Sequence, residues 1–230
     1  MSELILVMML LPLIGGGFVL TAPDNKNNAY NVAFFTLLAN IVIILRLFSG
    51  ISVLPQSEVS GFSFNWLENI GLDLYFGTDI FSLLLIIAVH LALLIGMVGL
   101  NATARKNKML LFLALYFACC LTGFFTAGDL LSFYGFFAGM LLPLFMLVGV
   151  CGGSKKIQIL YRFFIYNFIG ILFLLIASLI MYKFYHGNIR LNEIALVDMA
   201  PHAGLLVWTA VCLAFISRIP VWPFHSWIAS

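Results

Sequence analysis

The stretch Phe81-Ser-Leu-Leu-Leu-Ile-Ile-Ala-Val-His-Leu-Ala-Leu-Leu-Ile-Gly-Met-Val-Gly-Leu100 decides the fold class of this chain. Its single ionisable side chain is His90, and a helix needs about 20 mostly apolar residues to cross a bilayer. Apolar residues run through it continuously and do not alternate with polar ones, which favours a helix over a strand of a membrane barrel. We therefore expect this window to cross a membrane.

Six further windows have the same character. Together they predict an all-α fold, a polytopic membrane helix bundle of about seven transmembrane helices that forms a single transmembrane domain over residues 1–230. The expected spans are residues 4–21, 29–48, 81–100, 109–127, 130–151, 160–185 and 204–217, the last running into a broken tail, 218–230.

The composition excludes several classes of protein. Of the 230 residues, 63% are apolar and only 9% are charged, too few charges to cover a water-facing surface. A soluble enzyme, a nucleic-acid-binding protein, a secreted disulfide scaffold and a disordered linker are therefore excluded. Four cysteines fall in apolar runs without metal-ligand spacing, so we expect core-filling side chains and no metal site. They are Cys119, Cys120, Cys151 and Cys212.

Basic residues are distributed unevenly between the loops, which predicts an orientation because Lys and Arg favour the cytoplasmic or matrix side. The loops after the first, third and fifth spans contain Lys26, Arg105, Lys106, Lys108, Lys155, Lys156 and Arg162. The opposite side contains Arg46, Lys183 and Arg190. We expect the N-terminus to face the outer side and to begin a first span, since no cleavable signal pattern precedes Leu4.

Two segments on the outer side are longer than simple turns. In the first, the alternating pattern of Gly61–Trp66 predicts either a short hairpin or an interfacial aromatic anchor. The second, Arg190–Pro201, predicts a short amphipathic helix lying in the interface. Asp79 and Asp129 precede spans and are expected to cap helix N-termini.

The last span has an unusual ending, Arg218-Ile-Pro-Val-Trp-Pro-Phe-His-Ser-Trp227. Pro220 and Pro223 cannot continue a regular helix, because proline lacks the backbone N–H. Such breaks at membrane depth occur where protein or a water-filled cavity covers the freed backbone groups, and broken helices mark ion sites in transporters. Arg218 lies about 21 Å into this span at 1.5 Å per residue, which is inside the hydrocarbon.

Four residues are candidates for a proton pathway. Ionisable groups inside a membrane are costly, so Arg218 is interpreted as functional, with snorkelling towards the basic side as the alternative. His225 follows the break and is either a proton relay or an interfacial solvated histidine. His90 is either a relay or a hydrogen-bonded core histidine, and Arg162 is either a relay member or a cytoplasmic anchor. No Asp or Glu lies in the middle of any expected span, although proton conductors usually pair a carboxylate with a cation.

Several motifs are similar to those of one membrane protein family. Phe133-Tyr-Gly-Phe-Phe-Ala-Gly-Met-Leu-Leu-Pro143, Gly152-Gly-Ser-Lys-Lys156 and Tyr161-Arg-Phe-Phe-Ile-Tyr166 resemble its fifth-helix run and the segments that follow. Leu213-Ala-Phe-Ile-Ser-Arg-Ile-Pro-Val-Trp-Pro-Phe-His-Ser-Trp227 resembles its broken seventh helix, and Gly77-Thr-Asp-Ile-Phe-Ser82 the segment before its third helix. On these residues the chain resembles the large antiporter-like subunits of respiratory complex I, most closely subunit M, called chain 4 in mitochondria.

At two positions that matter for the family's mechanism, this chain has a different residue from the family. Ala138 occupies the position of the family's fifth-helix glutamate, and Arg218 that of its seventh-helix lysine. The family's proposed mechanism couples these two groups. An arginine does not release its proton in the physiological range, so we expect this half-channel to be impaired.

A third departure is length, because family members have about fourteen helices in two inverted repeats. We therefore expect the N-terminal half of a split subunit, with a second chain supplying the C-terminal half, or a degenerate half-subunit.

The resemblance implies a non-catalytic membrane-arm subunit of a proton-translocating NADH:quinone oxidoreductase. The expected partners are the other membrane-arm subunits and lipids, with no nucleic acid. No cofactor is expected in this chain; flavin, iron–sulfur clusters and quinone belong to other subunits. The expected location is an energy-transducing inner membrane, with a mitochondrion weakly favoured over a bacterium. The alternatives are a non-conducting structural subunit of the same complex, or a subunit of a cation/proton antiporter or membrane-bound hydrogenase.

Overall fold

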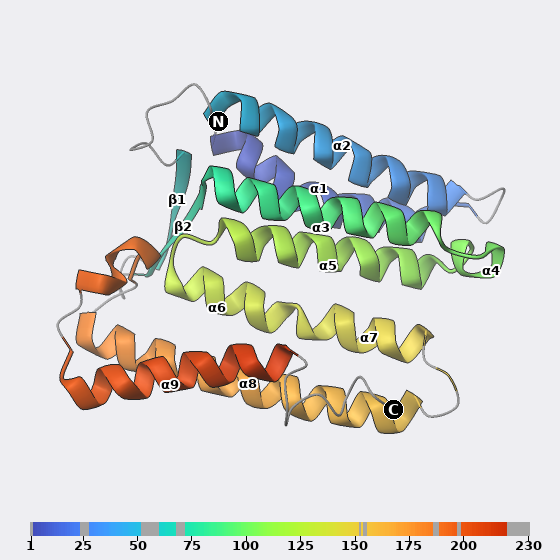
Figure 1. Ribbon diagram of the computed structural model, residues 1–230. Coiled ribbons are helices and arrows are strands. Elements are labelled where there is room, and N and C mark those ends of the chain that lie inside the picture. Colours follow the sequence, from blue (N-terminus) through green and yellow to red (C-terminus); the bar gives the residue numbers. More distant parts are fainter. Residues whose placement is uncertain are drawn as a thin grey trace. The chain divides into compact units, whose positions relative to one another are not determined.

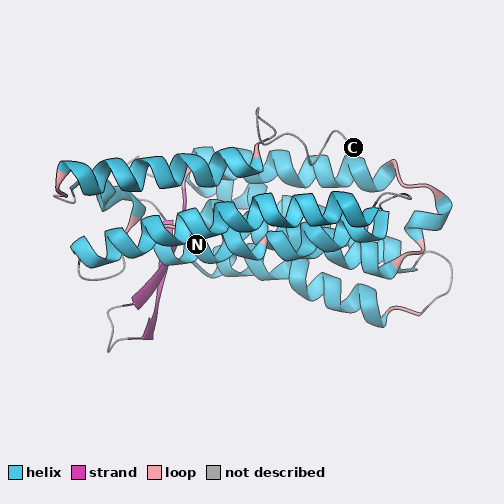
Figure 2. Ribbon diagram, turned by 90° about the horizontal axis from the view of Figure 1, so that it is seen from below, coloured by secondary structure: helices cyan, strands magenta, loops and turns pink. Residues whose placement is uncertain are grey.

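We analysed a computed structural model of the chain, which describes residues 2–23, 28–51, 60–67, 72–151, 153, 156–185, 189–196 and 199–219. Within these residues helices dominate, and two short strands are the other extended elements (Figures 1 and 2). The chain divides into two units, which are described separately. Unit 1 comprises Met1–Phe62 and Phe76–Ala127, and unit 2 comprises Ser63–Tyr75 and Gly128–Ser230.

In its described residues, unit 1 contains four long helices and one short one. The long helices α1, α2, α3 and α5 lie side by side in Figure 1, from blue to green. The elements are α1 (Ser2–Thr21), α2 (Asn28–Ile51), α3 (Ile80–Val98), the single turn α4 (Ala102–Arg105) and α5 (Lys108–Thr126).

The interior of unit 1 is apolar and close-packed. Leu37 of α2, Leu83 of α3 and Leu111 of α5 are fully buried between these helices. The helices α1 and α2 approach closely at Gly15, where an added Cβ would collide with the side chain of Thr36. A small residue at this crossing is typical of membrane helix pairs, because it lets two backbones come near each other.

The segment before α3 forms a two-stranded sheet of β1 (Ser60–Leu67) and β2 (Leu72–Thr78). Of the two interpretations offered by the alternating pattern of residues 61–66, paired strands are therefore observed. The side chain of Trp66 lies outside the described part of the structure. Asp79 follows β2 and caps α3, accepting a hydrogen bond from the backbone N–H of Ser82 at 2.8 Å, as the sequence predicted.

Unit 2 contains the remaining long helices. They are α6 (Leu130–Gly139), α7 (Leu141–Cys151), α8 (Lys156–Tyr185) and α9 (Pro201–Arg218), with the 3₁₀ helix η2 (Leu191–Leu196) between the last two. The helices α8 and α9 pack along each other, and Ala177, Val207 and Ala210 are buried there. The expected interfacial helix at Arg190–Pro201 is thus a 3₁₀ segment over part of that range.

The predicted fifth span, residues 130–151, consists of two consecutive helices that meet at Met140. Pro143 accounts for this interruption, since it offers no N–H to the carbonyl of Gly139 and its ring collides with that carbonyl in a regular helix. The N–H of Met140 still bonds to the carbonyl of Phe136 at 3.1 Å, so the two helices remain connected through one turn.

The polytopic helical fold predicted from the hydrophobic windows is confirmed. Among the described residues, seven helical segments are long and apolar enough to cross a membrane. They are Glu3–Thr21, Asn28–Gly50, Ile80–Val98, Lys108–Thr126, Leu130–Cys151, Lys156–Tyr185 and Pro201–Arg218.

Candidate functional site

Arg218, the intramembrane cation singled out in the sequence, is the last residue of α9 and is half-buried in unit 2. Its Nη2 donates a hydrogen bond to the backbone carbonyl of Phe137, and its Nη1 lies 3.4 Å from the sulfur of Met140. Its guanidinium carbon is 3.8 Å from the centre of the Phe137 ring. A carbonyl, a thioether and an aromatic face therefore surround this cation.

The groups that hold Arg218 belong to the end of α6, next to the interruption at Met140. Phe137 and Met140 are 2% and 4% exposed, so both are well packed. Together they form a cage around the guanidinium of Arg218. Phe215, one turn before Arg218 on α9, packs edge-on against Phe137 with ring centres 5.6 Å apart. This aromatic contact fixes the end of α9 against α6 and directs the arginine to its acceptors.

A close contact between α8 and α9 sets the position of Arg218 from the other side. A Cβ on Gly170 would lie 3.0 Å from the Cβ of Ser217 and 3.1 Å from the carbonyl oxygen of Ala214. Ser217 is 2% exposed, and its hydroxyl donates to the carbonyl of Ala214 at 2.7 Å. Glycine at 170 therefore allows the last turn of α9 to lie directly on α8.

Ala138, which the resemblance led us to expect at the position of the family's glutamate, follows Phe137 and is half-buried. It contributes a methyl group where a carboxylate is expected. Asp129, the N-cap residue of α6, lies about 12 Å from Phe137 along the helix axis. The cage of Arg218 thus uses neutral acceptors from α6 in place of an acidic side chain at 138.

Asp129 caps α6, as predicted, and does more than the sequence indicated. Its carboxylate is 1% exposed and accepts hydrogen bonds from the backbone N–H of Ser132 at 2.8 Å and of Tyr75 at 2.7 Å. Residue 129 also forms an antiparallel bridge with Arg190, whose guanidinium carbon lies 4.8 Å from the centre of the Tyr75 ring. The middle of β2, the start of α6 and the segment before η2 are therefore joined at Asp129.

His90 lies in unit 1, not with Arg218 in unit 2. It is fully buried, with Nε2 2.9 Å from the amide nitrogen of Asn40 on α2 and Nδ1 2.9 Å from the carbonyl oxygen of Ile86. Asn40 is fully buried too. Both ring nitrogens thus have a partner within hydrogen-bonding distance, a geometry that either interpretation of His90, relay or core histidine, allows. The sequence analysis did not single out Asn40, although an amide in the middle of an apolar span was the available signal.

The other predicted site residues are not brought together with Arg218 by the described contacts. Arg162 is half-buried near the start of α8, six residues after Lys156. His225, Pro220 and Pro223 lie outside the described residues. The described part of α9 ends at Arg218, and Ile219 has an extended backbone (φ −84°, ψ 131°), so the helix stops immediately before the first of those prolines.

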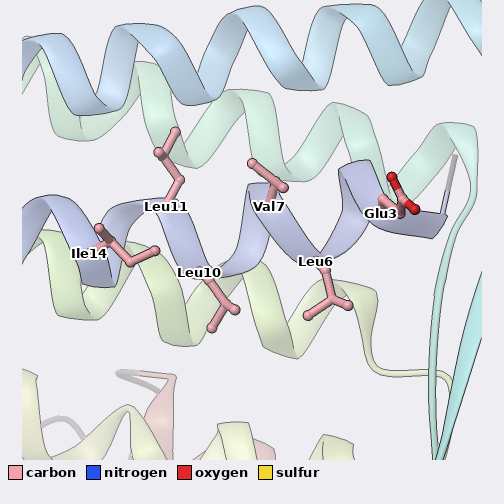
Figure 3. Close-up of a pocket in the computed structure, with 6 residues that line it drawn as sticks. All are labelled: Glu3, Leu6, Val7, Leu10, Leu11 and Ile14. Atoms are coloured by element: carbon pink, nitrogen blue, oxygen red, sulfur yellow. The ribbon is translucent and has the colours of Figure 1, made fainter.

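A groove of about 370 Å³ runs along α1 in unit 1 (Figure 3). It is apolar except for Glu3 at one end, and it lacks the convergent polar groups of a substrate site. Its lining residues are Glu3, Leu6, Val7, Leu10, Leu11 and Ile14.

Comparison with known proteins places these features in a family context. Residues 127–230 match the family model described as NADH:quinone oxidoreductase/Mrp antiporter, TM. That range contains α6, α7, α8, α9 and the cage of Arg218.

Curated relatives extend the similarity to nearly the whole chain. NADH-quinone oxidoreductase subunit M of Rickettsia conorii is 30% identical over 98% of this chain and 47% of its own length. NADH-ubiquinone oxidoreductase chain 4 of Chondrus crispus is 31% identical over 95% of this chain and 45% of its own length. The chain thus spans about half the length of the curated relatives it matches.

The fold is similar to that of a solved membrane complex. A chain in the structure titled respiratory complex I from Thermus thermophilus with bound NADH superposes with a TM-score of 0.83 and 26% identity. The match covers 97% of this chain and 46% of that one.

Proposed function

Because the chain resembles, along almost its whole length, the N-terminal half of the antiporter-like subunit M or chain 4 proteins, we propose that it serves as a membrane-arm subunit of a proton-translocating NADH:quinone oxidoreductase. The observation that carries this proposal is Arg218 at the end of α9, facing α6 next to the interruption at Met140. The role of the chain in the enzyme is non-catalytic, and electron transfer through flavin, iron–sulfur clusters and quinone belongs to other subunits.

The proposal includes an impaired half-channel in unit 2. A proton relay needs a group that gains and loses a proton, and a guanidinium keeps its proton throughout the physiological range. The family's glutamate would modulate such a relay, and alanine at 138 has no charge to do so. Arg218 then acts as a fixed positive charge held by Phe137 and Met140, while His225 and Arg162 remain candidate relay residues in the same half.

The proposed partners are the other membrane-arm subunits, lipids and the C-terminal half of the antiporter-like subunit supplied by a second chain. The proposed location is the energy-transducing inner membrane, with the basic loops towards the cytoplasm or matrix and a mitochondrion favoured. The second inverted repeat of the subunit would lie in that second half, as in other transporters built from two repeats.

A non-conducting structural subunit is the second candidate function. The packing of Arg218 on Phe137, with Phe215 against the same ring, supports this function, since these contacts hold the guanidinium in one place. Both candidate functions place the chain in the same complex. They differ in whether any proton crosses the membrane through this chain.

The test is proton translocation by the purified assembled complex in liposomes, measured per NADH oxidised. If the half-channel is impaired, Arg218→Ala leaves this ratio unchanged relative to the unsubstituted complex, while Arg218→Lys, which restores a releasable proton, leaves it unchanged or raises it. Normal translocation that is lost in Arg218→Ala would overturn the impaired half-channel. A complex that co-purifies without flavin, iron–sulfur clusters or quinone reduction would overturn the membership itself and favour an antiporter.

A further inference from the structure

The Asn40–His90 pair of unit 1 lies outside residues 127–230, the range that matches the family model. Asn40 is twelve residues into α2 and His90 is ten residues into α3, which corresponds to about 18 and 15 Å along the helix axes. Both side chains are fully buried. Polar side chains at such depth in a membrane span are costly and mark functional sites by default.

With the Asn40 amide nitrogen facing the ring, the two hydrogen bonds correspond to one protonation state of the imidazole. The carbonyl of Ile86 can only accept, so Nδ1, 2.9 Å away, carries the hydrogen. The amide nitrogen of Asn40 can only donate, so Nε2, also 2.9 Å away, presents its lone pair. In this arrangement His90 is a neutral imidazole whose basic nitrogen faces Asn40.

The amide oxygen of Asn40 defines a second, equally consistent state. Among the described residues this buried oxygen has no hydrogen-bond partner. A half-turn of the amide exchanges its oxygen and nitrogen, and the oxygen then faces Nε2. An oxygen in that place needs a hydrogen on Nε2, which is the protonated imidazolium. One proton and one amide rotation therefore interconvert two hydrogen-bonded arrangements.

The charges on the neighbouring helices set which arrangement is populated at rest. The helices α1, α2 and α5 pack against α3, whose only titratable residue is His90 itself. The titratable side chains on these three helices are Glu3 on α1, Tyr30 and Arg46 on α2, and Lys108, Tyr116, Cys119 and Cys120 on α5. The one acid among them, Glu3, is in the first turn of α1, and Asp79, which caps α3, is about 16 Å away along the axis. Without a nearby carboxylate a buried imidazolium is costly, so the neutral arrangement is the resting one.

We propose that Nε2 of His90 is a proton-binding site in unit 1, and that rotation of the Asn40 amide accompanies the binding of the proton. The proton adds to the Nε2 lone pair, no other bond forms or breaks, and the charge is held by the Asn40 oxygen and the Ile86 carbonyl. The site releases its proton readily, because no acid retains it. It is separate from the cage of Arg218 and does not require that unit 2 conduct.

The experiment is nitrogen-15 NMR of the full chain in its membrane assembly, with labelled histidine in this chain only. His90→Gln identifies the signals of His90, and His202→Gln, at an exposed position in the first turn of α9, is the matched control that leaves them in place. At neutral pH we expect Nδ1 protonated and Nε2 unprotonated. On acidification Nε2 becomes protonated while the chain stays folded.

Asn40→Leu tests the coupling, because leucine offers no oxygen to the imidazolium. We expect the proton affinity of His90 to fall about 10- to 100-fold in this variant, the range given by loss of one hydrogen bond to a charged group. A resting state with hydrogen on Nε2, an Nε2 that stays unprotonated until the chain unfolds, or an unchanged proton affinity in Asn40→Leu would each overturn the proposal. The NMR signals report on His90 whether or not the complex is an NADH:quinone oxidoreductase, so failure here is distinct from failure of the proposed function.

Discussion

The guanidinium carbon of Arg218 lies 3.8 Å from the centre of the Phe137 ring, although the two residues are 81 positions apart. The same phenylalanine supplies the carbonyl that accepts from Nη2 of the arginine. One residue of α6 therefore offers both its backbone and its side chain to the cation at the end of α9.

Replacing Phe137 by leucine removes the aromatic face and retains the carbonyl. We expect the free energy of unfolding to fall by about 2 kcal/mol, since a desolvated cation–π contact contributes about that much. Thermal unfolding of the purified full chain in lipid nanodiscs measures the change. Phe18→Leu, at a 62% exposed position of α1, is the control and should have little effect. Equal effects of the two variants would contradict the role of the ring.

Replacing Gly170 by alanine forces α8 and α9 apart, because the added Cβ meets Ser217 and the carbonyl of Ala214. Overpacking of this kind costs about 1–3 kcal/mol. Gly135→Ala is the matched control, since nothing lies within 4 Å of its added Cβ. The double variant with Ser217→Ala should recover part of the loss in the same unfolding assay, and a Gly170→Ala variant as stable as Gly135→Ala would disprove the close contact.

Asp129 and Asp79 are both helix caps, and they differ in burial and in the number of partners. We expect Asp129→Ala to destabilise the chain by about 3 kcal/mol, because a cap and the hydrogen bond from Tyr75 are both lost and a buried N–H is left unpaired. Asp79→Ala should cost about 1 kcal/mol, the usual value for an exposed cap. Chemical unfolding of the two variants side by side provides the comparison, and the reverse order would be inconsistent with the junction at Asp129.

Two glycines of α1, two residues apart in the sequence, should respond in opposite directions. Gly15→Ala collides with Thr36, whose side chain is held by a 2.7 Å hydrogen bond to the carbonyl of Val32, so we expect a loss of about 1–3 kcal/mol. Gly17→Ala meets no atom within 4 Å and should be neutral or stabilising by up to about 1 kcal/mol, from its higher helix propensity. Hydrogen exchange of α1 and α2 amides would register both effects, and similar exchange in the two variants would refute the helix crossing.

Hydrophobic windows alone predicted the seven spans. Each span is one continuous apolar run long enough to cross the bilayer, so it can be recognised without knowing any other part of the chain. The caps at Asp79 and Asp129 were predictable for the same reason, as each bonds a residue three positions later. The cage of Arg218 and the pair of Asn40 with His90 were not, because they join residues 81 and 50 positions apart. Such contacts depend on how helices rotate and cross, which no single window encodes.

The interruption at Met140 has a mechanical consequence. A continuous helix moves as one rod, whereas α6 and α7 are joined through a turn that Pro143 weakens. Phe137 belongs to the segment before this joint, so a bend there shifts the ring and carbonyl relative to the guanidinium of Arg218. A bend at this joint therefore alters the contacts of a charge that unit 2 holds half-buried at the end of α9.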